Sequence, residues 1–289
     1  MNRAEATDRI GVFDSGVGGL SVWKEIVRQL PDVPICYLAD QAHVPYGSRS
    51  LSEVHALSEA ITHFLLKQGA GVIVIACNTA SAAALHHLRR LFSNVPFVGM
   101  EPAVKPAAER THNGVIGVIA TQVTFQGDLF ASLVERYAGD THVLTRACPA
   151  LVEAVEAGAL DTPTTEEAVR QCIAPLVAAG IDQLVLGCTH YPFLRPVIER
   201  LAGPQVTVID PAPAVALQTA RVWRSRQRQE QAPPLTLSRP RHTFYTTGDV
   251  PAFAALLGRL LPDQDIPLDC VHAAHWQAGR LEPAGRMPR

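Results

Sequence analysis

The sequence predicts an α/β fold with two similar parallel-sheet domains, and three observations support this prediction. Apolar strand-like runs alternate with helical patterns along the chain, which is typical of βαβ units and a parallel sheet. Continuous apolar runs such as Val72–Ala76 suit strands that are buried on both faces. The same order of elements starts again near Gly114. We therefore expect two related domains that face each other about a pseudo-two-fold axis, with any active site in the cleft between them.

The first half is predicted to alternate strands and helices. Its expected strands are residues 9–13, 35–40, 71–77 and 96–100, and its expected helices are residues 18–30, 51–68 and 79–92. Between them, the stretch "QAHVPYGSRS" at 41–50 is rich in turn-forming residues and is predicted to form a loop.

The second half repeats this order. Its expected strands are residues 114–121, 142–148 and 183–188, and its expected helices are residues 125–137, 151–156 and 166–179. The stretch "QGAGVIVIACNTASAAAL" resembles "AGIDQLVLGCTHYPFL" in composition and spacing. The strands that end at Cys77 and Cys188 therefore occupy matching places in the two halves.

Beyond Asp210 the chain is expected to return to the first half, because the second half is already complete. A helix is predicted at 214–224, a strand at 243–249 and a helix at 251–261. Residues 225–242 are basic, rich in Gln and Pro and non-periodic, which predicts a long loop. The tail from residue 277 onward is expected to be frayed. The predicted domains are 1–101 with 211–289, and 102–210.

Composition favours a cytosolic globular protein. The chain has 289 residues, 47% of them hydrophobic, and a net charge of −2, so nothing suggests a nucleic-acid or membrane surface. No signal-peptide core and no run of about 18 apolar residues is present. A chain of this length does not need disulfides, so we expect free thiols in a reducing compartment. The cysteines are Cys36, Cys77, Cys148, Cys172, Cys188 and Cys270.

Cys77 and Cys188 are the candidate catalytic residues. Each ends a predicted strand and begins a helix, where unpaired N–H groups and the helix dipole stabilise a thiolate. Two acid/base groups on opposite faces of a carbon are what inversion of a stereocentre requires, since one takes a proton and the other returns one. Donors around a substrate carboxylate would stabilise the charge that develops.

A buried cysteine is more often a small core residue, and this is the alternative for each thiol. Their matching positions, each followed by hydroxyl or amide side chains, favour the catalytic interpretation for Cys77 and Cys188. The other four cysteines lack that setting and are predicted to be core residues.

Three further stretches could contribute to a site. "DSGVGG", Asp14–Gly19, permits close backbone approach and anion binding at a helix start, although an ordinary helix cap is the alternative. As a dinucleotide fingerprint it is weak, because Ser21 stands where a glycine would be needed, and the Walker lysine is missing. "VPYGS" is a turn that could present a backbone N–H. His190 could relay protons to the neighbouring thiol.

No cofactor is predicted. The Cys and His spacings match no zinc site, and no lysine occupies an evident pyridoxal phosphate setting.

The stretches "FDSGVGGLSV", "VPYGSRS", "ACNTASA", "GCTHYPFL" and "FYTTGD" resemble the glutamate racemases of the cofactor-independent aspartate/glutamate racemase superfamily. The resemblance implies a two-domain cytoplasmic enzyme that interconverts L- and D-glutamate for peptidoglycan, with Cys77 and Cys188 catalytic. It further implies that Asp14 and His190 assist proton transfer. The substrate-binding positions that it implies are Asp14, Ser15, Tyr46, Gly47, Asn78, Thr79, Thr121, Thr124, Thr189, His190 and Glu156, with Glu153 as the alternative to Glu156.

The resemblance is not complete. His43 stands where arginine is common in the family, "VGMEPAVKPA" differs from the usual wording, and the 225–242 segment and the tail have no recognised counterpart. Three alternatives stay open: an aspartate or broader-specificity racemase, a non-catalytic sensor of acidic amino acids, and a partner-binding protein that restrains an enzyme such as a gyrase. A homodimer is expected, because members of the family that the chain resembles often form homodimers.

Overall fold

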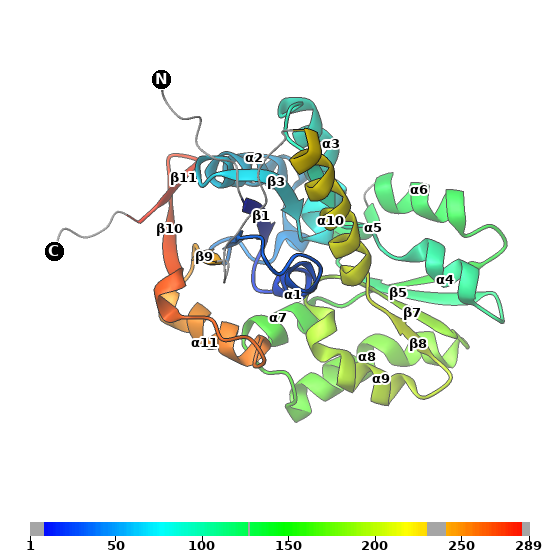
Figure 1. Cartoon of the computed structure of the whole chain (residues 1–289). Coiled ribbons are helices and arrows are strands. Elements are labelled where there is room, and N and C mark those ends of the chain that lie inside the picture. The colour runs from blue at the N-terminus through cyan, green and yellow to red at the C-terminus, as the bar shows by residue number, and fades with distance from the viewer. Residues whose placement is uncertain (1–8, 127, 230–240, 285–289) are drawn as a thin grey trace, which may run out of the picture.

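The computed structural model describes residues 9–126, 128–229 and 241–284, and it contains two β-sheets flanked by helices (Figure 1). The larger sheet has seven strands in the order β11-β10-β9-β2-β1-β3-β4, and the smaller has four in the order β6-β5-β7-β8. The strands of the larger sheet are β1 (Arg9–Asp14), β2 (Ile35–Ala39), β3 (Ala70–Ile75), β4 (Phe97–Gly99), β9 (Thr243–Thr246), β10 (Val271–Gln277) and β11 (Arg280–Pro283). Those of the smaller are β5 (Val115–Ala120), β6 (His142–Ala147), β7 (Gln183–Gly187) and β8 (Thr207–Ile209).

The internal repeat is visible in the strand order. β2-β1-β3-β4 and β6-β5-β7-β8 follow the same sequence of neighbours, and all of these pairs are parallel. β3 and β7 are therefore equivalent, each lying beside the first strand of its half. The predicted α/β fold with two related parallel sheets is confirmed. We propose the boundaries 101/102 and 210/211 for the two lobes, called here the first and second lobe.

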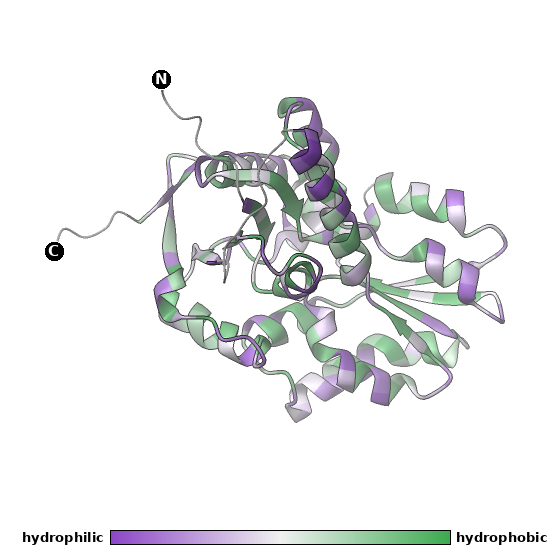
Figure 2. Ribbon diagram, viewed as in Figure 1, coloured by the Kyte–Doolittle hydropathy of each residue, from purple (hydrophilic) through white to green (hydrophobic). Residues whose placement is uncertain are grey.

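Helices cover both sheets. They are α1 (Leu20–Gln29), α2 (Leu51–Lys67), α3 (Asn78–Leu91), α4 (Val104–Arg110), α5 (Gln122–Gln126), α6 (Asp128–Tyr137), α7 (Pro149–Glu156), α8 (Pro163–Ala178), α9 (Arg195–Ala202), α10 (Ala212–Gln229) and α11 (Val250–Leu260), with 3-10 turns η1 (Tyr46–Ser48), η2 (Tyr191–Leu194) and η3 (Leu268–Cys270). Because helices lie on both faces, the central strands are apolar throughout, and Figure 2 shows them mostly green. β2 and β3 are buried along their full length.

Local sequence explains where individual helices begin and which face they bury. α2 starts at a capping box, in which Ser50 and Glu53 exchange hydrogen bonds with each other's backbone N–H groups. α1 buries Trp23 and Ile26, one turn apart, against the first sheet. Trp23 also packs against Phe244 of β9, with ring centroids 5.3 Å apart. This contact ties the returning C-terminal segment to the first lobe.

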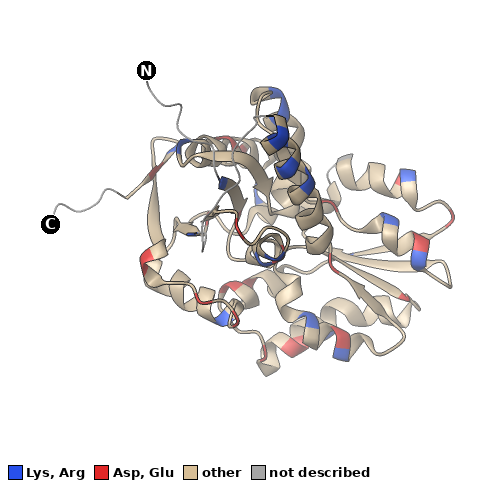
Figure 3. Ribbon diagram, in the orientation of Figure 1, with Lys and Arg blue, Asp and Glu red and all other residues tan. Residues whose placement is uncertain are grey.

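Charged side chains lie on the outer helices. Figure 3 shows blue positions along the second half of α10, where Arg221, Arg224 and Arg228 are exposed. Among the described residues, no helix is long and apolar enough to cross a membrane.

Several sequence-based expectations need correction at the C-terminal end. Residues 225–229 continue α10 and do not begin a loop, because buried Trp223 anchors its last turns. Residues 277–283 are not frayed, since β10 and β11 form an antiparallel hairpin closed by Ala278 and Gly279. The remainder of the predicted loop, 230–240, and the last residues, 285–289, lie outside the described residues. Helix 125–137 is divided into α5 and α6.

The expectation of six free thiols is wrong for two of them. Cys148 and Cys172 form a disulfide, because the start of α7 packs on α8 and brings their Cα atoms within 5.8 Å. Cys36, Cys77, Cys188 and Cys270 are free and buried, so the predicted core placement of Cys36 and Cys270 is confirmed.

Candidate active site

Cys77 lies two residues beyond β3 and caps the start of α3. Its side chain is 5% exposed, and the Ala80 N–H donates to Sγ at 3.4 Å. The thiol in turn donates to Ser15 Oγ at 3.9 Å. Burial raises the pKa of Cys77, and the nearby negative charge of Asp14 raises it further, while the Ala80 N–H opposes both. Cys77 therefore retains its proton in the resting site.

Cys188 lies directly after β7 in the second lobe, and its nearest partner is a histidine. Sγ is 3.6 Å from His190 Nδ1, and the residue is 7% exposed. The residue before it must be glycine, because a Cβ on Gly187 would lie 2.9 Å from Ala120 Cβ and from the Ile119 carbonyl oxygen. The "GC" pair thus combines close strand packing with a thiol at the strand end.

His190 joins Cys188 to Glu156. Its Nε2 is 2.7 Å from Glu156 Oε1, so one ring nitrogen contacts the carboxylate and the other contacts the thiol. Burial disfavours the imidazolium, but the interactions with Cys188 and Glu156 outweigh it and raise the pKa of His190 well above its ordinary value. The hydrogen bonds to Glu156 likewise overcome its burial and hold its pKa below the ordinary value. An imidazolium beside a sulfur is an arrangement that stabilises negative charge on a thiolate.

The "DSGVGG" turn is shaped by these side chains. A Cβ on Gly16 would lie 1.9 Å from Glu156 Oε1, and one on Gly18 would lie 2.4 Å from His190 Nδ1. Only glycine lets the turn approach the second lobe so closely. The nearest neighbours of this backbone are side chains of the opposite lobe.

Asp14 ends β1 and is fully buried at the centre of the site. The Gly16 N–H donates to its Oδ2 at 3.1 Å, and the Thr189 hydroxyl donates to its Oδ1 at 3.3 Å. Burial raises the pKa of Asp14 to about 6, against the opposing charge of His190. Its carboxyl group therefore changes protonation near neutral pH.

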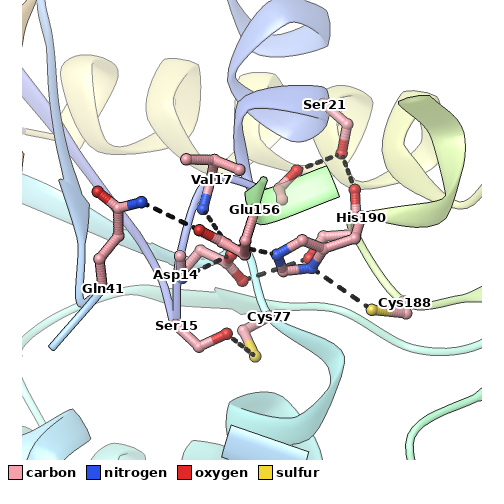
Figure 4. Close-up of polar contacts among 12 residues, drawn as sticks. Asp14, Ser15, Val17, Ser21, Gln41, Cys77, Glu156, Cys188 and His190 are labelled. Atoms are coloured by element: carbon pink, nitrogen blue, oxygen red, sulfur yellow. Dashed lines mark hydrogen bonds and ion pairs between the residues drawn. The ribbon is translucent and has the colours of Figure 1, made fainter. Parts of the chain in front are cut away.

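The two thiols share a cleft between the lobes, and Figure 4 shows the polar contacts that surround it. Its lining residues are Ser15, Pro45, Tyr46, Gly47, Cys77, Asn78, Thr79, Thr121, Val152, Cys188, Thr189 and His190. The cavity volume is about 10 Å³, at the lower limit of what one water molecule needs. A substrate can therefore enter only when the lobes separate.

Hydrogen bonds between the lobes hold the cleft closed. Thr79 Oγ1 and Thr121 Oγ1 are 2.9 Å apart, and the Val17 N–H donates to Glu156 Oε1 at 2.8 Å. The Ser21 hydroxyl shares its proton between the Gly18 carbonyl at 2.8 Å in its own lobe and the Thr189 carbonyl at 3.0 Å in the other. The closed state is thus maintained by groups that also line or support the site.

Asn78 is available to bind a ligand. Its side-chain oxygen and nitrogen are both buried, and neither has a hydrogen-bond partner among the described residues. Buried amides are normally paired, so an unpaired one that lines the cleft indicates a ligand-binding position.

Most sequence-predicted site residues line this cleft, but Asp14, Thr124 and Glu156 do not, and they contact lining residues instead. Thr124 does not line the cavity. Its hydroxyl is 2.9 Å from Thr121 Oγ1, so it forms a hydrogen bond with a residue that does. Of the two candidate glutamates, Glu153 is exposed, whereas Glu156 contacts His190.

Sequence reasoning missed several contributors. Val152 lines the cleft one helical turn before Glu156, a spacing that could have identified it. Val17, Ser21 and Gln41 contribute hydrogen bonds across the cleft, which no local pattern indicates. Within the described part of the chain, no group of three or more His, Cys, Asp or Glu side chains could hold a metal ion.

The fold and the two thiols define a class: a two-lobed α/β protein with one buried cysteine thiol from each lobe at an interlobe cleft. A family model described as Asp/Glu/Hydantoin racemase matches residues 10–219. The chain therefore belongs to the Asp/Glu/hydantoin racemase family.

Individual relatives are similar over nearly the whole chain. The glutamate racemase of Roseiflexus sp. (strain RS-1) is 48% identical over 265 residues, covering 92% of this chain and 95% of that protein. The glutamate racemase of Herpetosiphon aurantiacus is 54% identical over 213 residues, covering 74% and 84%.

Solved structures agree with this assignment. Glutamate racemase isoform RacE1 of Bacillus anthracis superposes with a TM-score of 0.79 at 35% identity, covering 94% of this chain and 98% of that one. Escherichia coli glutamate racemase, solved with L-glutamate and the activator UDP-MurNAc-ala, gives a TM-score of 0.78 at 30% identity, covering 96% and 100%.

Proposed function

We propose that this protein is a glutamate racemase, an isomerase that interconverts L- and D-glutamate and supplies the D-enantiomer for peptidoglycan. The observation that carries the proposal is the pair of thiols, Cys77 and Cys188, at equivalent strand ends on opposite sides of one cleft. A relative named glutamate racemase at 48% identity over 92% of the chain supports the choice of substrate.

In the proposed reaction one cysteine, as thiolate, takes the α-proton of bound glutamate and becomes a thiol. The opposite thiol gives its proton to the other face of Cα and becomes a thiolate, so protons and charge balance. The reverse reaction exchanges the two roles. At Cys188, His190 can accept or return a proton through Nδ1. At Cys77, the charge of Asp14 raises the pKa of the thiol and so favours its protonated form.

The substrate would be held by donors from both lobes. The Asn78 amide and the Thr79 hydroxyl are contributed by the first lobe, and the hydroxyls of Thr121 and Thr189 by the second. We assign binding roles to Ser15, Tyr46 and Gly47 as well, since they line the same cavity. Donors that surround a carboxylate also stabilise the negative charge that develops when the α-proton leaves.

A racemase of aspartate or of wider range is the alternative within the family, because the family description includes aspartate and hydantoin substrates. A non-catalytic sensor is less well supported. Binding an amino acid requires hydrogen-bond donors for its carboxylates. Two thiols, each beside its own acid/base side chain, add nothing to binding and are explained only by proton transfer.

The test is polarimetry on the purified protein with L-glutamate and, separately, L-aspartate, without added pyridoxal phosphate. Optical rotation of glutamate should decay to zero, at least tenfold faster than that of aspartate. Decay of aspartate alone would transfer the assignment to an aspartate racemase. If neither rotation changes while glutamate still binds in calorimetry, the sensor hypothesis replaces the racemase.

We also propose a homodimer and a cytoplasmic location, following the family resemblance. Sedimentation of the full chain at micromolar concentration tests the oligomeric state, and a single species of 31 kDa (the chain mass is 31.1 kDa) would rule the dimer out.

A further inference from the structure

Gln41 connects the two lobes beside the active site without lining the cavity. It follows Asp40 at the end of β2, in the loop that leads to Tyr46. Its Nε2 donates to Glu156 Oε2 at 3.0 Å across the lobe boundary. Figure 4 shows the Gln41 amide directed at Glu156. This loop residue therefore contacts the carboxylate that holds His190.

The orientation of the Gln41 amide is fixed by Thr246 at the end of β9. Thr246 Oγ1 accepts the Gly248 N–H at 2.9 Å, so its own proton is free to be donated to Gln41 Oε1 at 2.8 Å. Thr246 is fully buried, and a Cβ on Gly248 would lie 3.0 Å from Gln41 Cβ. The amide oxygen thus faces Thr246, which leaves the amide nitrogen to face the carboxylate.

Glu156 makes three hydrogen bonds, and two of them come from the first lobe. Oε1 accepts the Val17 N–H at 2.8 Å and lies 2.7 Å from His190 Nε2, while Oε2 accepts from Gln41. Closure of the lobes therefore completes the shell of the carboxylate that orients His190. When the lobes separate, Glu156 loses Val17 and Gln41 and retains only the partner in its own lobe.

We propose that Gln41, held by Thr246, is a positioning residue for the Cys188 side of the reaction. It acts through Glu156 and His190, so that His190 is correctly oriented beside Cys188 only when the cleft is closed. The chain of contacts runs from Thr246 to Gln41, Glu156, His190 and Cys188, and it links the returning C-terminal strand to one thiol but not to the other. The inference rests on the proposed racemase function.

The primary test is Gln41→Leu, which keeps the volume of the side chain and removes both hydrogen bonds. A hydrogen bond to a charged group is strong enough that kcat should fall about tenfold. KM should stay within about twofold, because Gln41 does not line the cavity. Gln68→Leu is the matched control: its Oε1 accepts from Tyr245, the neighbour of Thr246 on β9, away from the cleft. It should leave kcat unchanged.

A double-mutant cycle decides whether the effect passes through Glu156. In a Glu156→Gln background, Gln41→Leu should lower kcat by less than about twofold, since the carboxylate that it positions is gone. A further tenfold loss in that background, or no loss in the wild-type background, would overturn the proposal. Thr246→Val provides a second variant that leaves Gln41 in place, and a loss of about threefold in kcat is expected.

Isotope effects distinguish positioning of Cys188 from general loosening of the site. With α-deuterated glutamate, slowing the Cys188 step should raise the isotope effect on kcat/KM in the direction where Cys188 takes the proton. The effect should fall in the reverse direction, where Cys188 only returns one. Equal changes in both directions would contradict the proposal.

A wild-type protein that leaves glutamate untouched refutes the proposed function itself, whereas an active wild type with a fully active Gln41→Leu refutes only this inference.

Discussion

Cys77 and Cys188 end equivalent strands of the two lobes, but their surroundings are not equivalent. Around Cys77 lie the Ser15 hydroxyl and the Asp14 carboxyl, and the negative charge of Asp14 raises the pKa of the buried thiol beyond the effect of burial. Beside Cys188 lies His190, which Glu156 supports from its other ring nitrogen. One sulfur therefore faces a potential anion and the other a potential cation.

This difference shows what the internal repeat does and does not determine. The repeated strand order delivers a thiol from each lobe to one cleft, because β3 and β7 are equivalent. The proton partners of the two thiols differ even where the segments repeat: His190 stands two residues after Cys188, whereas Thr79 holds the same place after Cys77. We infer that burial and the charge of Asp14 keep the proton on Cys77 in the resting site.

Replacing each thiol in turn should have the largest effect on activity. Cys77→Ser and Cys188→Ser should each lower kcat by about 10³-fold, within the range for loss of a general acid or base. Cys36→Ala, which changes a buried free cysteine near the start of β2, should retain nearly full activity. Steady-state polarimetry in both directions measures all three. A Cys77 or Cys188 variant that keeps a tenth of the activity would contradict the two-thiol site.

His190→Asn should impair the Cys188 side most, because His190 contacts Cys188 directly and reaches Cys77 only through the charge of Asp14. Without an imidazolium, negative charge on the Cys188 sulfur loses its stabilising partner, so alkylation of Cys188 by iodoacetamide should slow about tenfold. The rate is measured by peptide mass spectrometry in a Cys77→Ser background. Alkylation of Cys77, followed in a Cys188→Ser background, serves as the control and should change less than about twofold.

Asp14→Asn should have the opposite effect on Cys77. Above pH 6 Asp14 is ionised, since its pKa is about 6, and its charge raises the pKa of Cys77. Asparagine carries no charge, so the pKa of Cys77 should fall and alkylation should become several-fold faster at pH 8. The pH profile of alkylation should move to lower pH, and a move to higher pH would reverse the assignment of Asp14.

The smallest expected effect concerns the hydroxyl pair that closes the cleft. Thr79→Val removes a neutral hydrogen bond to Thr121 and a donor for the substrate, so KM for glutamate should rise about fivefold with little change in kcat. Thr162→Val, which removes a comparable hydroxyl pair with Thr165 at the start of α8, is the matched control and should leave KM unchanged.

Local patterns in the sequence were sufficient to predict the strands, the repeat and the two strand-end thiols. Continuous apolar runs define buried strands, and a cysteine that ends such a strand before small polar residues lies where a helix start can stabilise its thiolate. The choice of Glu156 over Glu153 depends on which face of α7 meets His190, and that is a tertiary contact.

Long-range contacts account for what could not be predicted. Gln41 and Glu156 are 115 residues apart, and no local pattern connects them. The disulfide between Cys148 and Cys172 depends on the packing of α7 against α8, whereas composition alone favoured free thiols. The β10–β11 hairpin is stabilised by pairing at the edge of the sheet and by buried Leu281, in a stretch whose composition indicates only a frayed end.

The central claim, that protons are taken and returned by different groups on opposite faces, is tested most directly by the first turnovers in D2O. Purified protein is mixed with unlabelled L-glutamate, and the enantiomers are separated and their Cα–H content is measured by proton NMR at less than about a tenth of equilibrium. The two-thiol site predicts deuterium at Cα in the D-glutamate formed and almost none in the remaining L-glutamate. Equal labelling of both enantiomers from the start would mean that a single group serves both faces, and it would contradict the account.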